Sequence, residues 1–397
     1  MLAACVLTDE PVCLRNIPLI EDVTTMLEIL DDLGVSVELK GHTVSLCAKG
    51  LRKRRLNPDL CRRVRSSILL AGPLAARHGR AVIYPPGGDV IGRRRLDTHL
   101  DGLSALGIAV SGKHAYDFRR RNLQGARILL DEASVTATEN IIMAATLASG
   151  RTTIYNAACE PHVQDLCHML NRMGARICGI GANYLRIEGA QTLRGVSHRV
   201  SPDYIDTASF VAAAALTGGQ LTVEDAPADQ LDVIARPFEK LGISWTFHDK
   251  MLHLPARQKF RVRNDFGAAI PKIEDGVWPA LPSDLMSAAI VLATQARGTV
   301  LFFEKLFESR MYFVDRLIYM GARIVQCDPH RVIVTGPARL HGMHMSSPDI
   351  RAGMALLLAA LCAGGESFID NAESIDRGYE HVDRELRRLG ADIERVG

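Results

Sequence analysis

The sequence predicts an α/β fold with two similar domains, and three observations support this. A Leu-Gly or Met-Gly step recurs six times, at intervals of 67 to 79 residues. A second kind of helical segment, rich in small residues, recurs between these steps. The chain has 397 residues, of which 47% are hydrophobic and 23% charged. Such a chain is expected to be globular and is long enough for two domains.

Each Leu/Met-Gly step marks the end of an amphipathic helix and the start of a strand. Glycine just after a helix is typical of a left-handed C-terminal cap, and a short, strand-like run follows each of these glycines. The steps are Leu33-Gly34, Leu106-Gly107, Met173-Gly174, Leu241-Gly242, Met320-Gly321 and Leu389-Gly390. The predicted strands are VSVEL, IAVS, ARIC, ISWTF, ARIVQ and ADIERV.

The small-residue-rich helices are expected to lie inside and the amphipathic helices outside. Small side chains allow close helix packing, whereas the other helices alternate charged and apolar residues. The inner helices are predicted at Val64–Leu69, Thr138–Ser149, Thr207–Leu216, Ser283–Thr294 and Asp349–Cys362. A second strand follows each, in GRAVIYP, GRTTIYNA, GGQLTVED, RGTVLFFE and GGESFIDN. One repeat is thus helix, strand, loop, helix, Gly, strand.

Six repeats can form an open array or two compact groups of three, and we expect the second arrangement. The break then falls near Ser201-Pro202 and gives domains of residues 1–201 and 202–397, with a cleft between them. The first repeat is short, because its inner helix begins at Met1 and reaches Thr8-Asp9 in two turns. From the repeat alone, we expect half of that helix and the residues before it to be missing.

Composition excludes several classes of protein. The net charge of +2 gives no basic field for nucleic acid, and the runs Leu51–Arg55 and Arg119–Arg121 contain no aromatic residues. The nine cysteines form no Cys-x-x-Cys pair, and neither they nor the histidines have metal-ligand spacing. The longest apolar stretches fall short of the roughly 20 residues of a membrane span, and the start resembles no signal peptide. We expect reduced thiols in a cytoplasmic protein.

Polar residues precede the inner helices, where free N–H groups and the helix dipole attract anions. They are Arg65, Ser134, Thr136, Glu139, Asn140, Asp203, Asp206, Asp284, Asp349 and Arg351. The alternative interpretation is simple capping by Ser, Thr and Asp. The arginines Arg65 and Arg351 fit capping badly, because a cation opposes the dipole at that end. They favour an anionic partner.

A loop and two further arginines extend this anion-site prediction. The segment PPGGDVIGRRRLDTHL, residues 85–100, places Asp89 and an Arg triplet on a Gly-rich loop that is able to close over an anion. Alone, such a loop is as often a plain turn. Arg310, Arg351 and Arg377 occupy matched positions in successive repeats and together predict an anion clamp.

Several segments resemble the UDP-N-acetylglucosamine 1-carboxyvinyltransferase family over nearly the whole chain. They include LTDEPVCLRNIPLIEDVTTMLEILDDLG, SVTATENIIMAATLASGRTTIYNAACEP, LPSDLMSAA, LFESR and IDRGYEHVDRELRRLGADIERV. The resemblance implies an inside-out α/β barrel, with three repeats per domain and the helices inside. It also implies transfer of the enolpyruvyl group of phosphoenolpyruvate (PEP) to the 3-hydroxyl of UDP-N-acetylglucosamine, with release of phosphate. It implies no metal, no organic cofactor, and no nucleic-acid or membrane partner.

The resemblance also implies a role for each site residue. Asp89, where most members carry cysteine, would protonate the PEP methylene carbon, and Asp284 would take the proton of the acceptor hydroxyl. Four arginines would hold PEP: Arg94, Arg310, Arg351 and Arg377. Arg65 would help to bind the substrates, and Asp349 sits beside a PEP-binding arginine. The nucleotide-sugar contacts would be Arg94, Arg95, Leu96, Asp97, Thr98, Ala133, Ser134, Val135 and Leu306. With Asp89 in place of a thiol, we expect resistance to epoxides such as fosfomycin.

Four departures from the family pattern keep alternatives open. A Lys-Asn pair that binds PEP in the family is absent, because the chain starts inside the first inner helix. The usual Ala-Arg-Pro-Val-Asp is Arg93–Asp97, a frequent Lys is Glu132, and the second Glu of Glu-Pro-Glu is His162. The last three fall on the acceptor side, which favours another nucleotide acceptor such as UMP, as in nucleoside-antibiotic pathways. A late start codon or an inactive, truncated relative would explain the first.

Overall fold

The computed structural model describes residues 1–396, which form two compact units. Unit 1 contains Met1–Gly88 and Arg94–Ser201, and unit 2 contains Asp89–Arg93 and Pro202–Gly397. The short segment Asp89–Arg93 therefore makes its contacts with the second half of the chain, although its flanks belong to the first. That the units fold as two independent three-repeat domains remains a prediction.

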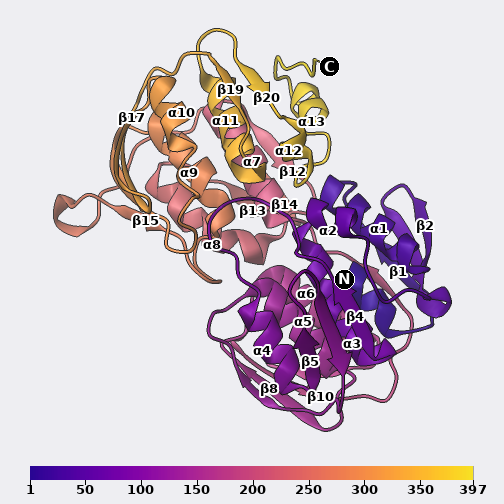
Figure 1. The fold of residues 1–397 in the computed structure, drawn as a ribbon. Coiled ribbons are helices and arrows are strands. Elements are labelled where there is room, and N and C mark those ends of the chain that lie inside the picture. The colour runs from indigo at the N-terminus through magenta and orange to yellow at the C-terminus, as the bar shows by residue number, and fades with distance from the viewer. Residues whose placement is uncertain (397) are drawn as a thin grey trace. The chain divides into compact units, whose positions relative to one another are not determined.

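Unit 1 consists of three sheets and the helices packed on them (Figure 1). Its helices are η1 (Leu2–Leu7), α1 (Glu21–Leu33), η2 (Ala48–Gly50), α2 (Pro58–Arg63), η3 (Arg65–Leu70), α3 (Ala71–His78), α4 (Asp97–Ala105), α5 (Val135–Ala145) and α6 (Pro161–Arg172), where η marks a 3-10 helix. Its strands are β1 (Val12–Arg15), β2 (Ser36–Lys40), β3 (Thr43–Cys47), β4 (Arg80–Ile83), β5 (Ile108–Ser111), β6 (Tyr116–Arg120), β7 (Arg127–Leu129), β8 (Arg151–Tyr155), β9 (Arg176–Cys178), β10 (Tyr184–Glu188) and β11 (Val196–Arg199).

Unit 2 repeats this plan with its own three sheets (Figure 1). Its helices are α7 (Tyr204–Leu216), α8 (Ala228–Lys240), η4 (Phe266–Ala268), α9 (Ser283–Gln295), α10 (Val314–Tyr319), α11 (Ile350–Cys362), α12 (Glu373–Asp376) and α13 (Val382–Arg388). Its strands are β12 (Leu221–Val223), β13 (Thr246–His248), β14 (Met251–Leu254), β15 (Lys272–Glu274), β16 (Gly298–Phe303), β17 (Arg323–Asp328), β18 (Arg331–Gly336), β19 (His344–Ser346) and β20 (Phe368–Asp370).

Each repeat contributes one small sheet, which confirms the predicted repeat structure. The strand orders are β11-β1-β3-β2, β4-β6-β5 and β7-β8-β10-β9 in unit 1, and β12-β14-β13, β15-β16-β18-β17 and β19-β20 in unit 2. The strand in the middle of each larger sheet, such as β10 or β18, was not predicted. These strands pair antiparallel with both neighbours, so each predicted pair of strands is joined through an additional one.

The predicted glycine caps are confirmed in all six repeats. Gly34, Gly107, Gly174, Gly242, Gly321 and Gly390 have φ between +85° and +104°. An L side chain adopts this region only at a cost, so glycine ends each outer helix and turns the chain into the next segment. The last such segment, ADIERV, forms no strand, and this part of the prediction was wrong.

The predicted inner helices are buried and pack against one another. In unit 2, α7, α9 and α11 contact each other pairwise, and every residue of α9 from Leu285 to Thr294 is buried. In unit 1, α5 packs against α3 and η3, while η1 lies against α3. The helix α4, which precedes Gly107 and was predicted to lie outside, also packs against α5. Small side chains let these helices approach closely and leave the sheets on the outside. The first inner segment, Leu2–Leu7, is a 3-10 helix, and so is Arg65–Leu70, where the second inner helix was predicted at Val64–Leu69.

A buried amide joins the inner elements of unit 1. Asn140 of α5 is fully buried, and its Nδ2 donates to the Ile68 carbonyl at 2.8 Å. Its Oδ1 accepts from the Gly72 backbone N–H at 2.6 Å. Since η3 carries Arg65 at its start, this bond network fixes the position of that arginine's backbone.

None of the helices in residues 1–396 combines the length and the apolar character that a membrane span requires.

Candidate active site

The N-terminal ends of the three inner helices of unit 2 carry the predicted acidic and basic residues. Asp203 caps α7 by accepting from the Ile205 N–H at 2.7 Å. Asp349 caps α11 by accepting from the N–H groups of Arg351 and Ala352 at 2.9 and 3.0 Å. The capping interpretation is therefore confirmed for these two aspartates. Asp284 lies in the first turn of α9, which has no side-chain cap.

Asp284 joins two arginines of unit 2, one buried and one largely buried. Its Oδ1 accepts from Arg310 Nη2 at 2.8 Å, and its Oδ2 accepts from Arg351 Nε at 3.0 Å. The side chains of Arg310 and Arg351 are 2% and 15% exposed, whereas that of Asp284 is 39% exposed. The carboxylate is therefore held by two guanidinium groups and remains partly exposed to solvent. This geometry suits a group that accepts a proton from a substrate hydroxyl.

Two guanidinium nitrogens of this cluster are left without a hydrogen-bond acceptor. Within the described chain, Nη1 of Arg310 and Nη1 of Arg351 are buried and donate no hydrogen bond. The Arg310 atom lies 3.9 Å from Asp349 Oδ1, which is an ion-pair distance only. Buried donors without acceptors are costly, so they indicate the place of an anionic ligand.

Asp89 and Arg377 form an ion pair within unit 2. Arg377 Nη1 donates to Asp89 Oδ1 at 2.5 Å, and the two side chains are 18% and 11% exposed. The segment that carries Asp89 is held by two further bonds, from the Ser309 N–H to the Ile91 carbonyl and from the Arg93 N–H to Glu308 Oε2. The sequence predicted that Asp89 lies on a loop able to close over an anion. In the structure this loop contacts Arg377, one of the predicted arginines.

Burial changes the protonation of the neighbouring carboxyls. Burial raises the pKa of Asp349, and the charge of Asp89 raises it further, while hydrogen bonds from α11 and the charge of Arg310 oppose the rise. Burial and the charge of Asp203 raise the pKa of Asp206 to about 7. Although burial alone would lower the pKa of Arg351, the charge of Asp284 raises it above its ordinary value. The cluster thus keeps its guanidinium groups charged and limits its negative charge.

A second group of predicted residues lies together in unit 1. Arg65 Nη2 donates to the carbonyls of Arg94 and Arg95 at 2.9 and 3.3 Å. Burial and the charge of Arg94 lower the pKa of Arg65 to about 10. Arg95 is exposed and forms an ion pair with Asp97, with one bond at 2.6 Å. Two cations close together favour an anionic ligand.

The predicted nucleotide contacts around α4 and α5 are adjacent in unit 1. Thr98 of α4 lies 3.4 Å from Glu132, measured between Thr98 Oγ1 and Glu132 Oε1. Ser134 caps α5 by accepting from the Ala137 N–H at 3.4 Å. Ala133 and Val135 flank this cap and are half-buried, and Leu96 is buried just before α4. Leu306 of unit 2 is 42% exposed and lies on the loop that leads to Arg310.

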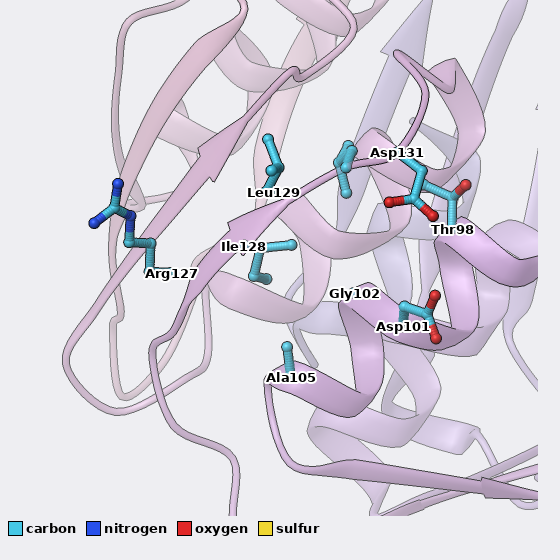
Figure 2. Close-up of a pocket in the computed structure, with 9 residues that line it drawn as sticks. Thr98, Asp101, Gly102, Ala105, Arg127, Ile128, Leu129 and Asp131 are labelled. Atoms are coloured by element: carbon cyan, nitrogen blue, oxygen red, sulfur yellow. The ribbon is translucent and has the colours of Figure 1, made fainter.

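A shallow pocket lies beside this group, between α4 and β7. Its volume is about 230 Å³, and its lining includes Thr98, Asp101, Gly102, Ile128 and Asp131. Figure 2 shows Ile128 between the strand and the helix, whereas the Arg127 side chain extends away from the helix. The pocket thus adjoins the predicted nucleotide contacts through Thr98 and Asp131.

Three buried residues of unit 2 belong to this site but were not predicted from the sequence. Ser283 Oγ accepts from Arg310 Nε at 3.2 Å, and it also contacts Glu304. The Tyr379 ring lies 5.3 Å from the Arg351 guanidinium carbon. The segment LPSD offered one signal for Ser283, because its hydroxyl comes directly before the proposed base Asp284 in the sequence. Glu304 and Tyr379 had no comparable signal.

Comparisons with known proteins place the whole chain among enolpyruvyl transferases. A family model described as EPSP synthase (3-phosphoshikimate 1-carboxyvinyltransferase) matches residues 1–394. The UDP-N-acetylglucosamine 1-carboxyvinyltransferases of Treponema denticola and Bradyrhizobium diazoefficiens are 52% and 51% identical, over 99% and 100% of this chain and 92% of each relative. The crystal structure of the enolpyruvyl transferase NikO from Streptomyces tendae has a TM-score of 0.87 at 22% identity, covering 99% of this chain and 92% of that chain. That likeness confirms the predicted fold.

Proposed function

Since the chain belongs to the UDP-N-acetylglucosamine 1-carboxyvinyltransferase family, we propose that it transfers the enolpyruvyl group of PEP to the 3-hydroxyl of UDP-N-acetylglucosamine and releases phosphate. The observation that carries this proposal is the pair of buried guanidinium nitrogens of Arg310 and Arg351 that have no acceptor among residues 1–396. PEP carries a phosphate and a carboxylate, and each is able to accept from such donors.

In this proposal the reaction needs one acid and one base. The Asp89 carboxyl delivers a proton to the methylene carbon of PEP, and the 3-hydroxyl oxygen of the acceptor attacks the adjacent carbon. Asp284, whose side chain is 39% exposed, takes the hydroxyl proton. The methyl group then returns a proton to the Asp89 carboxylate as the C–O bond to phosphate breaks, which restores the double bond and releases phosphate. Arg310, Arg351 and Arg377 stabilise the anionic intermediate.

Asp89 has to change partners during this cycle. In the structure its carboxylate accepts from Arg377. PEP brings its own anionic groups, and we propose that one of them replaces Asp89 as the partner of Arg377. Asp89 then takes up the proton that it donates, inside a site from which water is excluded. In unit 1, Arg65, Arg94 and the residues of α4 and α5 described above bind the uridine nucleotide. We place the reaction in the cytoplasm, as the supply of a peptidoglycan precursor.

Release of phosphate from PEP tests the proposal directly. We expect release with PEP plus UDP-N-acetylglucosamine, and none with PEP alone. Release with UMP but not with the nucleotide sugar would favour the alternative acceptor, which Glu132 supports because its charge lies beside Thr98, one of the predicted nucleotide-sugar contacts. No release with either acceptor, by this chain or by a version preceded by a relative's Lys-Asn segment, would contradict transferase activity.

Asp89 also predicts resistance to epoxide inhibitors. Because a carboxylate is a far weaker nucleophile than a thiolate, fosfomycin should leave the protein unmodified at a concentration that fully labels an Asp89→Cys variant. Intact-mass measurement of both proteins after incubation with fosfomycin and UDP-N-acetylglucosamine checks this. Equal labelling of the two proteins would show that position 89 does not decide sensitivity.

A further inference from the structure

Two buried carboxyls lie behind Arg310 in unit 2 and have no part in the proposed transfer. Asp275 follows β15 and Glu304 follows β16, and both residues are 0% exposed. These two strands are parallel neighbours, so their carboxyl ends meet at the same edge of the sheet. Two buried acids at the same edge require a structural explanation, because burying even one carboxylate costs free energy.

A hydroxyl connects these acids to the substrate-binding arginine. Ser283 Oγ lies 3.0 Å from both carboxyl oxygens of Glu304, and it accepts from Arg310 Nε at 3.2 Å. A serine hydroxyl has one proton, so it donates to Glu304 while it accepts from the arginine. Nη2 of the same guanidinium donates to Asp284. Arg310 is thus held through Nε and Nη2, and within the described chain its Nη1 is left for a ligand.

The hydrogen-bond pattern around the two acids lacks one donor, which a single shared proton would supply. Asp275 Oδ1 accepts from the Lys305 N–H at 2.5 Å, but within residues 1–396 its buried Oδ2 has no partner. Glu304 Oε1 accepts from the N–H groups of Leu306 and Phe307 at 3.3 and 3.1 Å. A proton shared between the acids supplies the donor that Oδ2 lacks, and it removes one of two like charges.

The charges that face Glu304 agree with this arrangement. Burial, hydrogen bonding with Asp275 and the charge of Asp275 raise the pKa of Glu304 to about 8, against the opposing effects of Arg310 and Ser283. The ring of His330, from the turn before β18, bonds the Glu304 backbone carbonyl through Nδ1 at 2.7 Å, and the His330 carbonyl accepts from the Glu304 N–H at 2.8 Å. The Lys305 ammonium lies 3.4 Å from Glu274, on the exposed side of β15.

We propose that Asp275 and Glu304 act as positioning residues: they share one proton, and through Ser283 they hold the Arg310 guanidinium in place for an anionic group of the substrate. This inference rests on the proposed function, since it names the device that sets the PEP-binding arginine. Loss of the shared proton puts a second negative charge behind Arg310. That charge competes with the substrate for the guanidinium and weakens PEP binding.

The pH dependence of the KM for PEP tests the proposal. From pH 7 to pH 9 we expect the KM of the wild-type protein to rise by about tenfold, with a smaller change in kcat, as for one unit charge added several ångströms from the arginine. Glu304→Gln has nearly the same shape and an N–H donor that cannot be lost, so its KM should stay flat. Glu274→Gln is the matched control, because this neighbouring carboxylate is half-exposed and does not contact Arg310; it should follow the wild-type curve.

A hydroxyl exchange tests the link between the acids and the arginine. Ser283→Ala removes the bond to Arg310 Nε and should raise the KM for PEP by about tenfold at pH 7. Ser283→Thr keeps a hydroxyl and should restore most of the affinity. If alanine and threonine variants behave alike, the proposed link is wrong.

A measurement without substrate separates this inference from the proposed function. A carboxyl with a raised pKa stabilises the fold below its unfolded value of 4.5, and this contribution is lost as pH rises toward about 8. The thermal midpoint of the wild-type protein should therefore fall from pH 5 to pH 8 relative to that of Glu304→Gln. If Glu304→Gln does not fold, Asp275→Asn provides the same comparison. The inference is wrong if the wild-type and variant curves of thermal midpoint against pH are parallel and their KM curves are parallel as well. If the wild type is inactive but the midpoint curves diverge, only the proposed function is wrong.

Discussion

Replacing Asp284 by asparagine is expected to lower kcat by about 10³-fold, because the amide cannot accept the proton of the acceptor hydroxyl. The same change removes the carboxylate that pairs with Arg310 and Arg351. The two guanidinium groups then repel each other, so binding of PEP should also change. Steady-state phosphate release at saturating PEP and acceptor measures the first effect.

The Asp284 variant should also be less stable. Arg310 is buried, and leaving a buried charge without its partner costs several kcal/mol; since Asp284 is partly exposed, we expect a loss of about 2 kcal/mol in the free energy of unfolding. Urea unfolding without substrates gives this value. Asp315→Asn, in the exposed first turn of α10, is the matched control and should change neither quantity. A variant that keeps more than a tenth of the wild-type kcat would argue against Asp284 as the base.

Asp89→Asn should lower kcat by about 10²- to 10⁴-fold, the range expected when a general acid is removed. Asparagine has nearly the same shape and is still able to accept from Arg377, so the ion-pair site stays filled while the transferable proton is lost. Asp89→Cys is the informative control, because a thiol also donates a proton. It should retain activity, because its thiol is able to deliver the proton.

The outcome that contradicts this role is equal activity of the asparagine and wild-type proteins. Solvent deuterium uptake into the methyl group of the intermediate gives a second readout, since it reports proton delivery to carbon. Loss of uptake in Asp89→Asn together with normal PEP binding would separate proton transfer from binding.

The repeat architecture could be predicted because its signals are local. Each signal is encoded by residues that lie only a few positions apart: a glycine at a helix end, small residues on an inner helix, or a short apolar run. The six positive φ values at positions such as Gly34 and Gly321 follow from this. The middle strands of the sheets, such as β6 and β10, were missed because they are short and alternate with charged residues, as YDFRR and YLRIE show.

The site was predicted in part, because residue type and repeat position identify arginines and aspartates but not their partners. The sequence marked Asp284, Arg310 and Arg351 as candidates, yet only the packing of α9 against α11 shows that one carboxylate binds both arginines. Glu304 in FFEK resembles a surface charge at the end of a strand. Its complete burial depends on the loop that folds over it, and no pattern in the neighbouring sequence predicts this burial.

The pairing of Asp89 with Arg377 has a consequence for how the protein is made. The two residues lie 288 positions apart, and the segment Asp89–Arg93 makes its contacts with the second half of the chain. While the ribosome is translating, the acid emerges early, and its ion pair with Arg377 forms only after residue 377 has left the exit tunnel. A nascent chain therefore cannot assemble this reaction centre, however well its first three repeats have folded.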